Sequence, residues 1–137
     1  MTTLVTKRYE WDMAHRLPLH DGKCRRLHGH RYVVEIDFSG QIFIDGPSTG
    51  MVIDFSKVKT MLDLLIGDEW DHRCMVHKDD DLLIGLQADR VEDFVVVDWM
   101  PTAENIAREL FRLLRDTWNV TRVRVYETPS GWAEVTK

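Results

Sequence analysis

The feature that most constrains the fold is a stretch of strict alternation that runs from His28 to Phe38. Every second side chain in it is apolar or a histidine: His28, His30, Tyr32, Val34, Ile36 and Phe38. The positions between them are largely polar: Gly29, Arg31, Val33, Glu35 and Asp37. Because successive side chains on a strand point to opposite faces, this pattern predicts a β-strand with one apolar face and one largely polar face.

The remaining periodicity predicts further strands and two helices around this strand. β-branched and aromatic residues, and in places renewed alternation, predict strands over 3–13, 94–97, 120–127 and 132–136, the second of them short and buried. Apolar side chains at helical spacing predict helices over 55–66 and 103–114. Asp54 is expected to cap the first helix and Gly67 to end it, and Pro101-Thr102 opens the second.

These elements give the order β-β-α-(β)-α-β-β, an α+β pattern with antiparallel hairpins at both ends. Residues 68–93 are polar and are expected to be irregular. We find no repeat and no linker, and 44% of the residues are hydrophobic. We therefore expect one domain over 1–137 with a single core.

Charge and cysteine content narrow the possible partners and location. With 18 Lys and Arg against 23 Asp and Glu, the formal net charge is −5, which argues against broad binding to nucleic acid or an anionic membrane. No apolar run approaches the roughly 20 residues that cross a bilayer, and the first residues are not those of a signal peptide. Two cysteines are too few for a disulfide scaffold, so we expect a cytoplasmic protein.

Histidines are concentrated near the start of the chain, and their spacing is suited to a metal ion. His28 and His30 project from one face of the predicted strand, about 7 Å apart along the backbone. His15, at the end of the preceding strand, is the best candidate for a third ligand of a catalytic zinc site. The alternative is a set of solvent-facing or hydrogen-bonded histidines.

Cys24 precedes His28 by four positions and allows three interpretations. It could be a fourth metal ligand, which would close the site and make it structural. It could be a buried apolar thiol, the usual state of a free cysteine. It could also be an activated thiolate beside the metal, since Lys23, Arg25 and Arg26 flank it and cationic neighbours favour the thiolate.

Two further groups are candidates for acid–base chemistry and binding. If Asp71 orients the imidazole of His72, that ring becomes a proton donor; the alternative is a surface loop. Glu127 shares a strand face with Val123 and Val125, where a carboxylate is costly unless it is paired or exposed. A ligand with adjacent N–H donors, such as a pterin or guanine edge, would pair with it; the alternative is a solvated strand end.

Taken together, these residues resemble the 6-pyruvoyl-tetrahydropterin synthase family. The resemblance covers the chain nearly end to end, through six segments in the family's order: Met13–Leu17, Cys24–His30, Gly50–Phe55, Asp71–Arg73, Pro101–Asn105 and Val125–Thr128. The three residues between Cys24 and His28 are similar to the branch that forms 6-carboxy-5,6,7,8-tetrahydropterin, which serves 7-deazapurine (queuosine) biosynthesis. The pyruvoyl-forming animal branch has a longer gap.

The resemblance implies a role for each candidate residue. His15, His28 and His30 would hold Zn²⁺, Cys24 would be the catalytic cysteine, and Asp71 with His72 the acid–base pair. Glu127 would anchor the pterin and Thr102 would contact its ring. The implied reaction converts 7,8-dihydroneopterin triphosphate into 6-carboxytetrahydropterin, acetaldehyde and triphosphate.

The resemblance also implies the architecture. It is the tunnelling fold, expected here as a four-stranded antiparallel sheet with two helices packed on one face. Trimers would pair into homo-hexamers with active sites at subunit interfaces. The segment from Cys74 to Asp98 is the least family-like part, and Met13 stands where a small residue is more usual.

Two other functions remain open from the sequence. One is pyruvoyl-tetrahydropterin synthase, which shares the zinc and Cys24 but forms another product. The other is a non-catalytic zinc-stabilised interaction module with Cys24 as fourth ligand. His20, His77 and Cys74 have no assigned role, and Arg25 and Arg26 are candidates for phosphate binding on charge alone.

Overall fold

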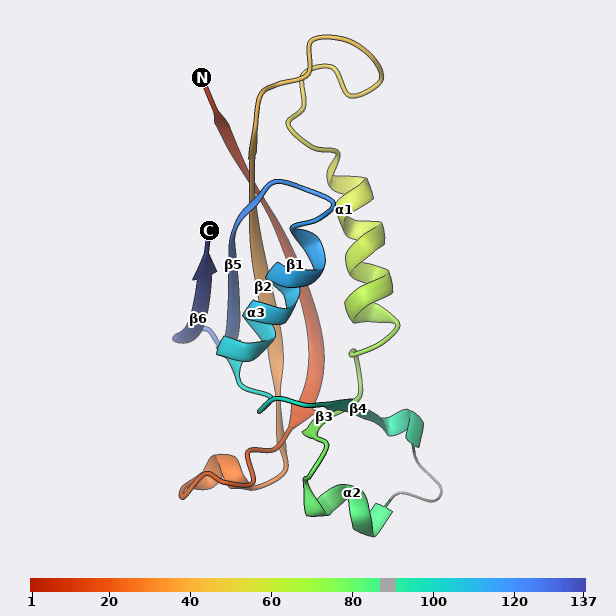
Figure 1. The fold of residues 1–137 in the computed structure, drawn as a ribbon, viewed down its shortest axis with the longest axis vertical. Coiled ribbons are helices and arrows are strands. Elements are labelled where there is room, and N and C mark those ends of the chain that lie inside the picture. Colours follow the sequence, from red (N-terminus) through yellow and green to blue (C-terminus); the bar gives the residue numbers. More distant parts are fainter. Residues whose placement is uncertain (87–90) are drawn as a thin grey trace.

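The computed structural model describes residues 1–86 and 91–137, which form a twisted sheet covered by helices (Figure 1). The strands are β1 (Thr3–His15), β2 (His28–Gly40), β3 (Cys74–His77), β4 (Phe94–Val97), β5 (Val120–Thr128) and β6 (Gly131–Thr136). The helices are α1 (Phe55–Leu62), α2 (Asp81–Leu86) and α3 (Ala103–Leu114), with short helical turns η1 (Lys23–Arg25), η2 (Asp63–Gly67) and η3 (Val91–Asp93).

The sheet has six strands in the order β4-β3-β1-β2-β5-β6. The hairpins β1–β2 and β5–β6 and the central pair β2–β5 are antiparallel, as predicted. The prediction of a four-stranded, wholly antiparallel sheet is wrong, because β3 pairs in parallel with the end of β1, and β4 pairs in parallel with β3. These two short strands extend the sheet beside the site described below.

The core lies on one face of the sheet, beneath α1 and α3, so the prediction of two helices on one face is confirmed (Figure 1). The even-numbered side chains of β2 and the odd-numbered side chains of β1 supply its floor. Val58 and Leu62 from α1 and Ile106 and Leu110 from α3 are fully buried against it. Burial of this apolar surface is the main force that holds the helices on the sheet.

Local sequence determines where the two covering helices begin. The side chain of Asp54 accepts a hydrogen bond from Ser56 N (2.8 Å) at the start of α1. Thr102 does the same for Asn105 N (3.3 Å) at the start of α3. Both satisfy a backbone N–H that the first helical turn leaves without a partner. After α1 the chain continues through one π-helical turn, η2, which ends at Gly67 as predicted.

Within the predicted irregular segment 68–93, residues 68–86 and 91–93 depart most from the prediction, and residues 87–90 lie outside the described ranges. The described residues contain β3 and α2 within a segment expected to be irregular. β4 was expected to be buried, yet it is an edge strand whose Val96 is 52% exposed. Within the described ranges, no helix is long and apolar enough to cross a membrane.

The second face of the sheet is polar, and ion pairs cross it from strand to strand. Its most buried member is Asp37, which accepts hydrogen bonds from Arg122 Nε (2.7 Å) and Thr6 Oγ1 (2.7 Å). Burial raises the pKa of Asp37, but the bonds from Arg122 and Thr6 outweigh this and hold that pKa below its usual value. The carboxylate is therefore charged and paired, which explains how it is buried in a strand.

Candidate metal centre and active site

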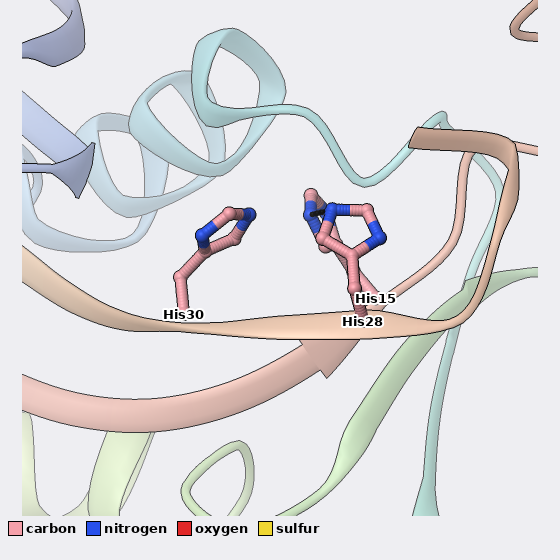
Figure 2. A group of neighbouring side chains, drawn as sticks. All are labelled: His15, His28 and His30. Carbon is pink, nitrogen blue, oxygen red and sulfur yellow. Dashed lines mark hydrogen bonds between the residues drawn. The ribbon is translucent and has the colours of Figure 1, made fainter. Parts of the chain in front are cut away.

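Three histidines meet on the core face where β1 ends and β2 begins. The strands pair so that His15 lies opposite His28, and Met13 lies opposite His30. The three rings rise from the same side of the two strands (Figure 2). One nitrogen of each lies within 4.8 Å of the others, and these residues form one of two groups in the described chain that could hold a metal ion. The predicted grouping of these three histidines is thus present.

Two of the rings are oriented by backbone carbonyl groups. His15 Nδ1 lies 2.7 Å from Pro101 O, and His28 Nδ1 lies 2.6 Å from Arg26 O. A carbonyl oxygen only accepts, so both rings carry a proton on Nδ1 and donate it. Each neutral ring then has its lone pair on Nε2, and these two atoms face one another at 3.1 Å.

Two facing lone pairs repel each other unless a cation lies between or beside them. A divalent metal is such a cation, and metal-bound histidines usually donate their second nitrogen to a carbonyl or carboxylate, as both rings do here. The geometry therefore fits a metal site with three histidine ligands.

Burial favours the neutral, metal-binding form of His15 and His30, because it lowers the pKa of both rings. His15 is 1% exposed, and its burial lowers its pKa from 6.5 to about 4, which the bond to Pro101 O only partly offsets. His30 also has a lowered pKa, from burial and from the neighbouring His28. The rings of His15 and His30 pack edge-on against the fully buried Tyr32, with ring centres 5.8 and 5.5 Å away.

Gly29, between the two histidines of β2, allows the strands to approach closely. A Cβ atom at this position would lie 3.0 Å from Met13 O and 3.3 Å from the Cα of Ala14. Both neighbours are backbone atoms of β1, the strand that carries His15. The absence of a side chain at Gly29 therefore helps to set the distance between His15 and His28.

Cys24 lies in the loop that connects the two histidine-bearing strands. It is a half-buried free thiol in η1, and its carbonyl oxygen accepts a hydrogen bond from Leu17 N (3.0 Å), which closes the loop. The group of mutually close ligand atoms consists of His15, His28 and His30 and does not include Cys24. This arrangement favours an open metal site over one closed by a fourth protein ligand.

Glu127 and Thr102 both lie beside the histidines. Glu127 Oε1 is 3.9 Å from His15 Nε2, and burial together with the nearby Glu104 raises the pKa of Glu127. Thr102 follows Pro101, whose carbonyl group holds His15, so the N-terminus of α3 is anchored at the site. Only 33% of the Glu127 side chain is exposed, so an unpaired carboxylate there favours a ligand that donates hydrogen bonds.

Asp71 and His72 form a contact, as their sequence suggested, but they belong to a second group, with Asp12, that is separate from the three histidines. Asp71 Oδ1 is 2.9 Å from His72 Nδ1 and also accepts a hydrogen bond from Asp12 N (2.9 Å). The side chain of Asp12 alternates with that of Met13 and so points to the polar face of the sheet. His72 has φ = 61°, a strained left-handed conformation, and it is bonded to the same strand through Asp12 O (2.8 Å).

Some contributors to the site were not predicted. The carbonyl groups of Pro101 and Arg26 orient two rings, yet a backbone acceptor leaves no signal in side-chain identity. Of the residues left without a role, His20 Nδ1 accepts a local bond from Gly22 N (2.8 Å). Burial raises the pKa of the Cys74 thiol to about 11, so this cysteine stays protonated.

Comparison with known proteins identifies the family. The sequence pattern described as 6-pyruvoyl tetrahydropterin synthase matches residues 4–137. A Haemophilus influenzae protein named 6-carboxy-5,6,7,8-tetrahydropterin synthase is 35% identical over 136 residues, which cover 95% of this chain and 96% of that protein.

Solved structures give the same result for the fold. An uncharacterized protein from Wolinella succinogenes superposes with a TM-score of 0.85 at 24% identity, over 100% of this chain and 99% of that one. The 6-pyruvoyl tetrahydropterin synthase of Caenorhabditis elegans superposes with a TM-score of 0.72 at 25% identity, over 100% and 96% of the two chains. The chain therefore belongs to the 6-pyruvoyl tetrahydropterin synthase family and has its tunnelling fold.

Proposed function

We propose that this protein is a zinc-dependent lyase that converts 7,8-dihydroneopterin triphosphate and one water molecule into 6-carboxy-5,6,7,8-tetrahydropterin, acetaldehyde and triphosphate. The observation that carries the proposal is the pair of Nε2 atoms of His15 and His28, which face each other at 3.1 Å with both Nδ1 atoms on carbonyl groups. The Haemophilus relative with the name of this synthase supports the choice of reaction.

The metal would be held by His15, His28 and His30, with an open position for substrate because Cys24 lies outside the ligand group. Zinc bound there would supply a Lewis acid that makes the side-chain hydroxyl groups of the substrate more acidic. The carbonyl groups of Pro101 and Arg26 fix two of the ligands before the metal binds, which reduces the rearrangement that binding requires.

Glu127 and Thr102 would bind the pterin ring. The raised pKa of Glu127 reflects its burial and the nearby Glu104, so a ligand with two adjacent N–H donors would stabilise its carboxylate. The amino-pyrimidinone edge of a pterin has such donors. This contact would orient the ring with its side chain toward the histidines, of which His15 has its Nε2 3.9 Å from Glu127 Oε1.

Cys24, Asp71 and His72 would move protons. The Cys24 thiolate would accept a carbon-bound proton next to the ring, and His72, oriented by Asp71 at 2.9 Å, would return a proton as triphosphate leaves. A water molecule would then add to the carbonyl carbon next to the ring, so that cleavage of the carbon–carbon bond yields the carboxylate and acetaldehyde. In one chain the Asp71–His72 pair lies on the polar face of the sheet, opposite to His15. We infer that the pair serves the site of a neighbouring subunit, in a homo-hexamer made of two trimers.

The proposal extends to the domain, location, pathway and partner of the protein. Residues 1–137 act as a single cytoplasmic domain that supplies a carboxylated pterin for 7-deazapurine (queuosine) biosynthesis. The partner is a small molecule rather than nucleic acid or a membrane, in line with the net charge of −5.

Product analysis tests the proposal. Zinc-loaded protein incubated with 7,8-dihydroneopterin triphosphate should release acetaldehyde, 6-carboxytetrahydropterin and triphosphate in equal amounts. Release of triphosphate without acetaldehyde would show a pyruvoyl-tetrahydropterin synthase instead. If the protein binds zinc tightly but does not convert this substrate, it is a non-catalytic zinc-stabilised module instead.

Two histidine variants, one inside and one outside the proposed ligand group, test the metal site. His28→Gln removes one of the facing Nε2 atoms and should lose zinc and activity together. His20→Gln changes an exposed histidine of the same segment, outside the ligand group, and should keep both. Equal zinc content in the two variants would contradict the assignment of the site.

A further inference from the structure

A cavity of about 640 Å³ lies next to the proposed active site and has no assigned role. It is bounded by the Cys24 loop on one side and by the segment after β3 on the other. Its lining consists of Arg16, Pro18, Leu19, Arg25, Arg26, His77, Asp79, Asp81 and Met100. Arg25 directly follows Cys24, and Met100 directly precedes Pro101, whose carbonyl group orients His15. The cavity therefore adjoins both the thiol and the histidine cluster.

Two arginines of this cavity have no carboxylate partner. Arg25 and Arg26 form no ion pair within residues 1–86 and 91–137, although most other arginines in those ranges do. Arg25 and Arg26 are both exposed, so their guanidinium groups are accessible to an anion from solvent. Guanidinium groups bind phosphate oxygens through paired N–H donors.

Two further donors are held in place around the same cavity. Asp79 N donates to His77 Nδ1 (3.1 Å), so in the neutral ring the proton is on Nε2 and that atom is a donor. Arg16 donates through Nε to Asp80 Oδ2 (3.0 Å) and through one terminal nitrogen to Asp80 and Asp81. Asp80 is buried, so it fixes the guanidinium of Arg16 while the second terminal nitrogen remains available.

The two acidic residues of the lining are largely exposed to solvent, and one of them also forms an ion pair with Arg16. The carboxylate of Asp81 binds Arg16 and is 83% exposed. The carboxylate of Asp79 is 79% exposed and lies 3.8 Å from His77 Nδ1. Water screens exposed charges of this kind strongly. Arg25 and Arg26, which directly follow Cys24 in the sequence, are therefore the cations of the lining that no carboxylate of the described chain neutralises.

We propose that this cavity binds the triphosphate group of the substrate, with Arg25 and Arg26 as its main contacts and His77 and Arg16 as additional donors. The inference rests on the proposed function and extends it to the leaving group. It explains how an acidic protein binds a polyanion, because the favourable charge is local. It also places the leaving group next to Cys24, on the chain segment that joins the two histidine-bearing strands.

The test compares charge-removing variants on two ligands. Arg25→Gln and Arg26→Gln should each raise KM for 7,8-dihydroneopterin triphosphate about tenfold, the range of a single charge-assisted contact at a partly exposed site. The inhibition constant of 7,8-dihydroneopterin, which lacks phosphate, should stay unchanged. Arg108→Gln, an exposed arginine of α3 without an ion pair in the described chain, is the matched control and should change neither value.

A binding measurement makes the result independent of turnover. Calorimetry with inorganic triphosphate on the purified proteins, with zinc content measured before and after, should show about tenfold weaker binding in each cavity variant. Equal binding in all the proteins, or equal weakening in Arg108→Gln, would overturn the site. If the wild-type protein binds triphosphate through these arginines but forms no acetaldehyde, the proposed function fails and the anion site stands. If it forms acetaldehyde and neither arginine matters, the anion site fails and the function stands.

Discussion

Gly29→Ala tests whether the approach of two strands sets the metal site. Gly29 separates His28 from His30, and an added Cβ would lie 3.0 Å from Met13 O, whereas ordinary contacts of this kind begin at 3.4 Å. The contact is with backbone rather than with a flexible side chain, so β1 itself must move by several tenths of an ångström. That strand carries His15, whose Nε2 lies 3.1 Å from His28 Nε2.

Gly29→Ala should lower both the stability of the fold and its affinity for zinc, and these two losses can be measured separately. Extra volume in a packed region that cannot relax costs about 1–3 kcal/mol of unfolding free energy. Displacement of one ligand strand should weaken zinc binding about 10- to 100-fold, since metal sites need their ligands held to within about 0.5 Å. Urea unfolding of the metal-free protein measures the first, and competition with a chromogenic chelator measures the second.

Gly40→Ala is the control on the other end of the same strand. There the added Cβ would meet a side-chain methyl group of Val52 at 3.1 Å, which can move away. We expect a loss of less than about 1 kcal/mol and unchanged zinc affinity. Wild-type zinc affinity and stability in Gly29→Ala, or equal effects in the two variants, would refute the reasoning.

Three further predictions follow from burial and charge. Because the pKa of His15 is lowered from 6.5 to about 4 on folding, the unfolded chain binds more protons between these values, so the metal-free protein should lose stability as the pH falls. The loss should be about 2 kcal/mol between pH 7 and pH 5 in urea unfolding, and a flat profile, or one unchanged in His15→Gln, would contradict it. Asp37→Asn leaves Arg122 without its buried partner and should lower the free energy of unfolding by about 2–3 kcal/mol. Arg112→Gln removes the exposed pair with Glu109 and should lower it by less than about 1 kcal/mol in the same assay. Glu127→Gln should lower kcat/KM about 10- to 100-fold with zinc content unchanged, and loss of zinc would instead make Glu127 part of the metal site.

The long hairpin shows how far alternation can predict a fold. It assigned the faces of β2 correctly from His28 to Phe38, because the strand period is fixed by backbone geometry. It did not predict that Asp37, on the polar face, is buried. That burial depends on Arg122 and Thr6, which come from other strands, and a single-strand pattern contains no information about them.

The short strand β3 could not be predicted for a related reason. Cys74–His77 has only four residues and a run of aspartates close behind it. Its pairing with Ala14 and His15 and with β4 stabilises it, and these are tertiary contacts. A four-residue segment has only a weak local tendency to form a strand, so its pairing with neighbouring strands decides its structure.

The spatial grouping of the three histidines was predictable from the sequence, but their arrangement in the sheet was not. Same-face spacing brought His28 and His30 together, and His15 followed as the end of the preceding strand. The alignment of His15 opposite His28 depends on the pairing register of the two strands. The long loop that connects them does not fix this register. The contact between Asp71 and His72 was expected, whereas its position on the polar face depends on the sheet as a whole.

Zinc content measured beside turnover in Cys24→Ala tests the central claim most directly. Cys24 lies outside the group of close histidines, and in the proposed reaction its thiol is a proton acceptor. The variant should therefore retain zinc at the wild-type ratio while acetaldehyde release from 7,8-dihydroneopterin triphosphate falls to background. Loss of zinc in this variant, or turnover at the wild-type rate, would contradict the account.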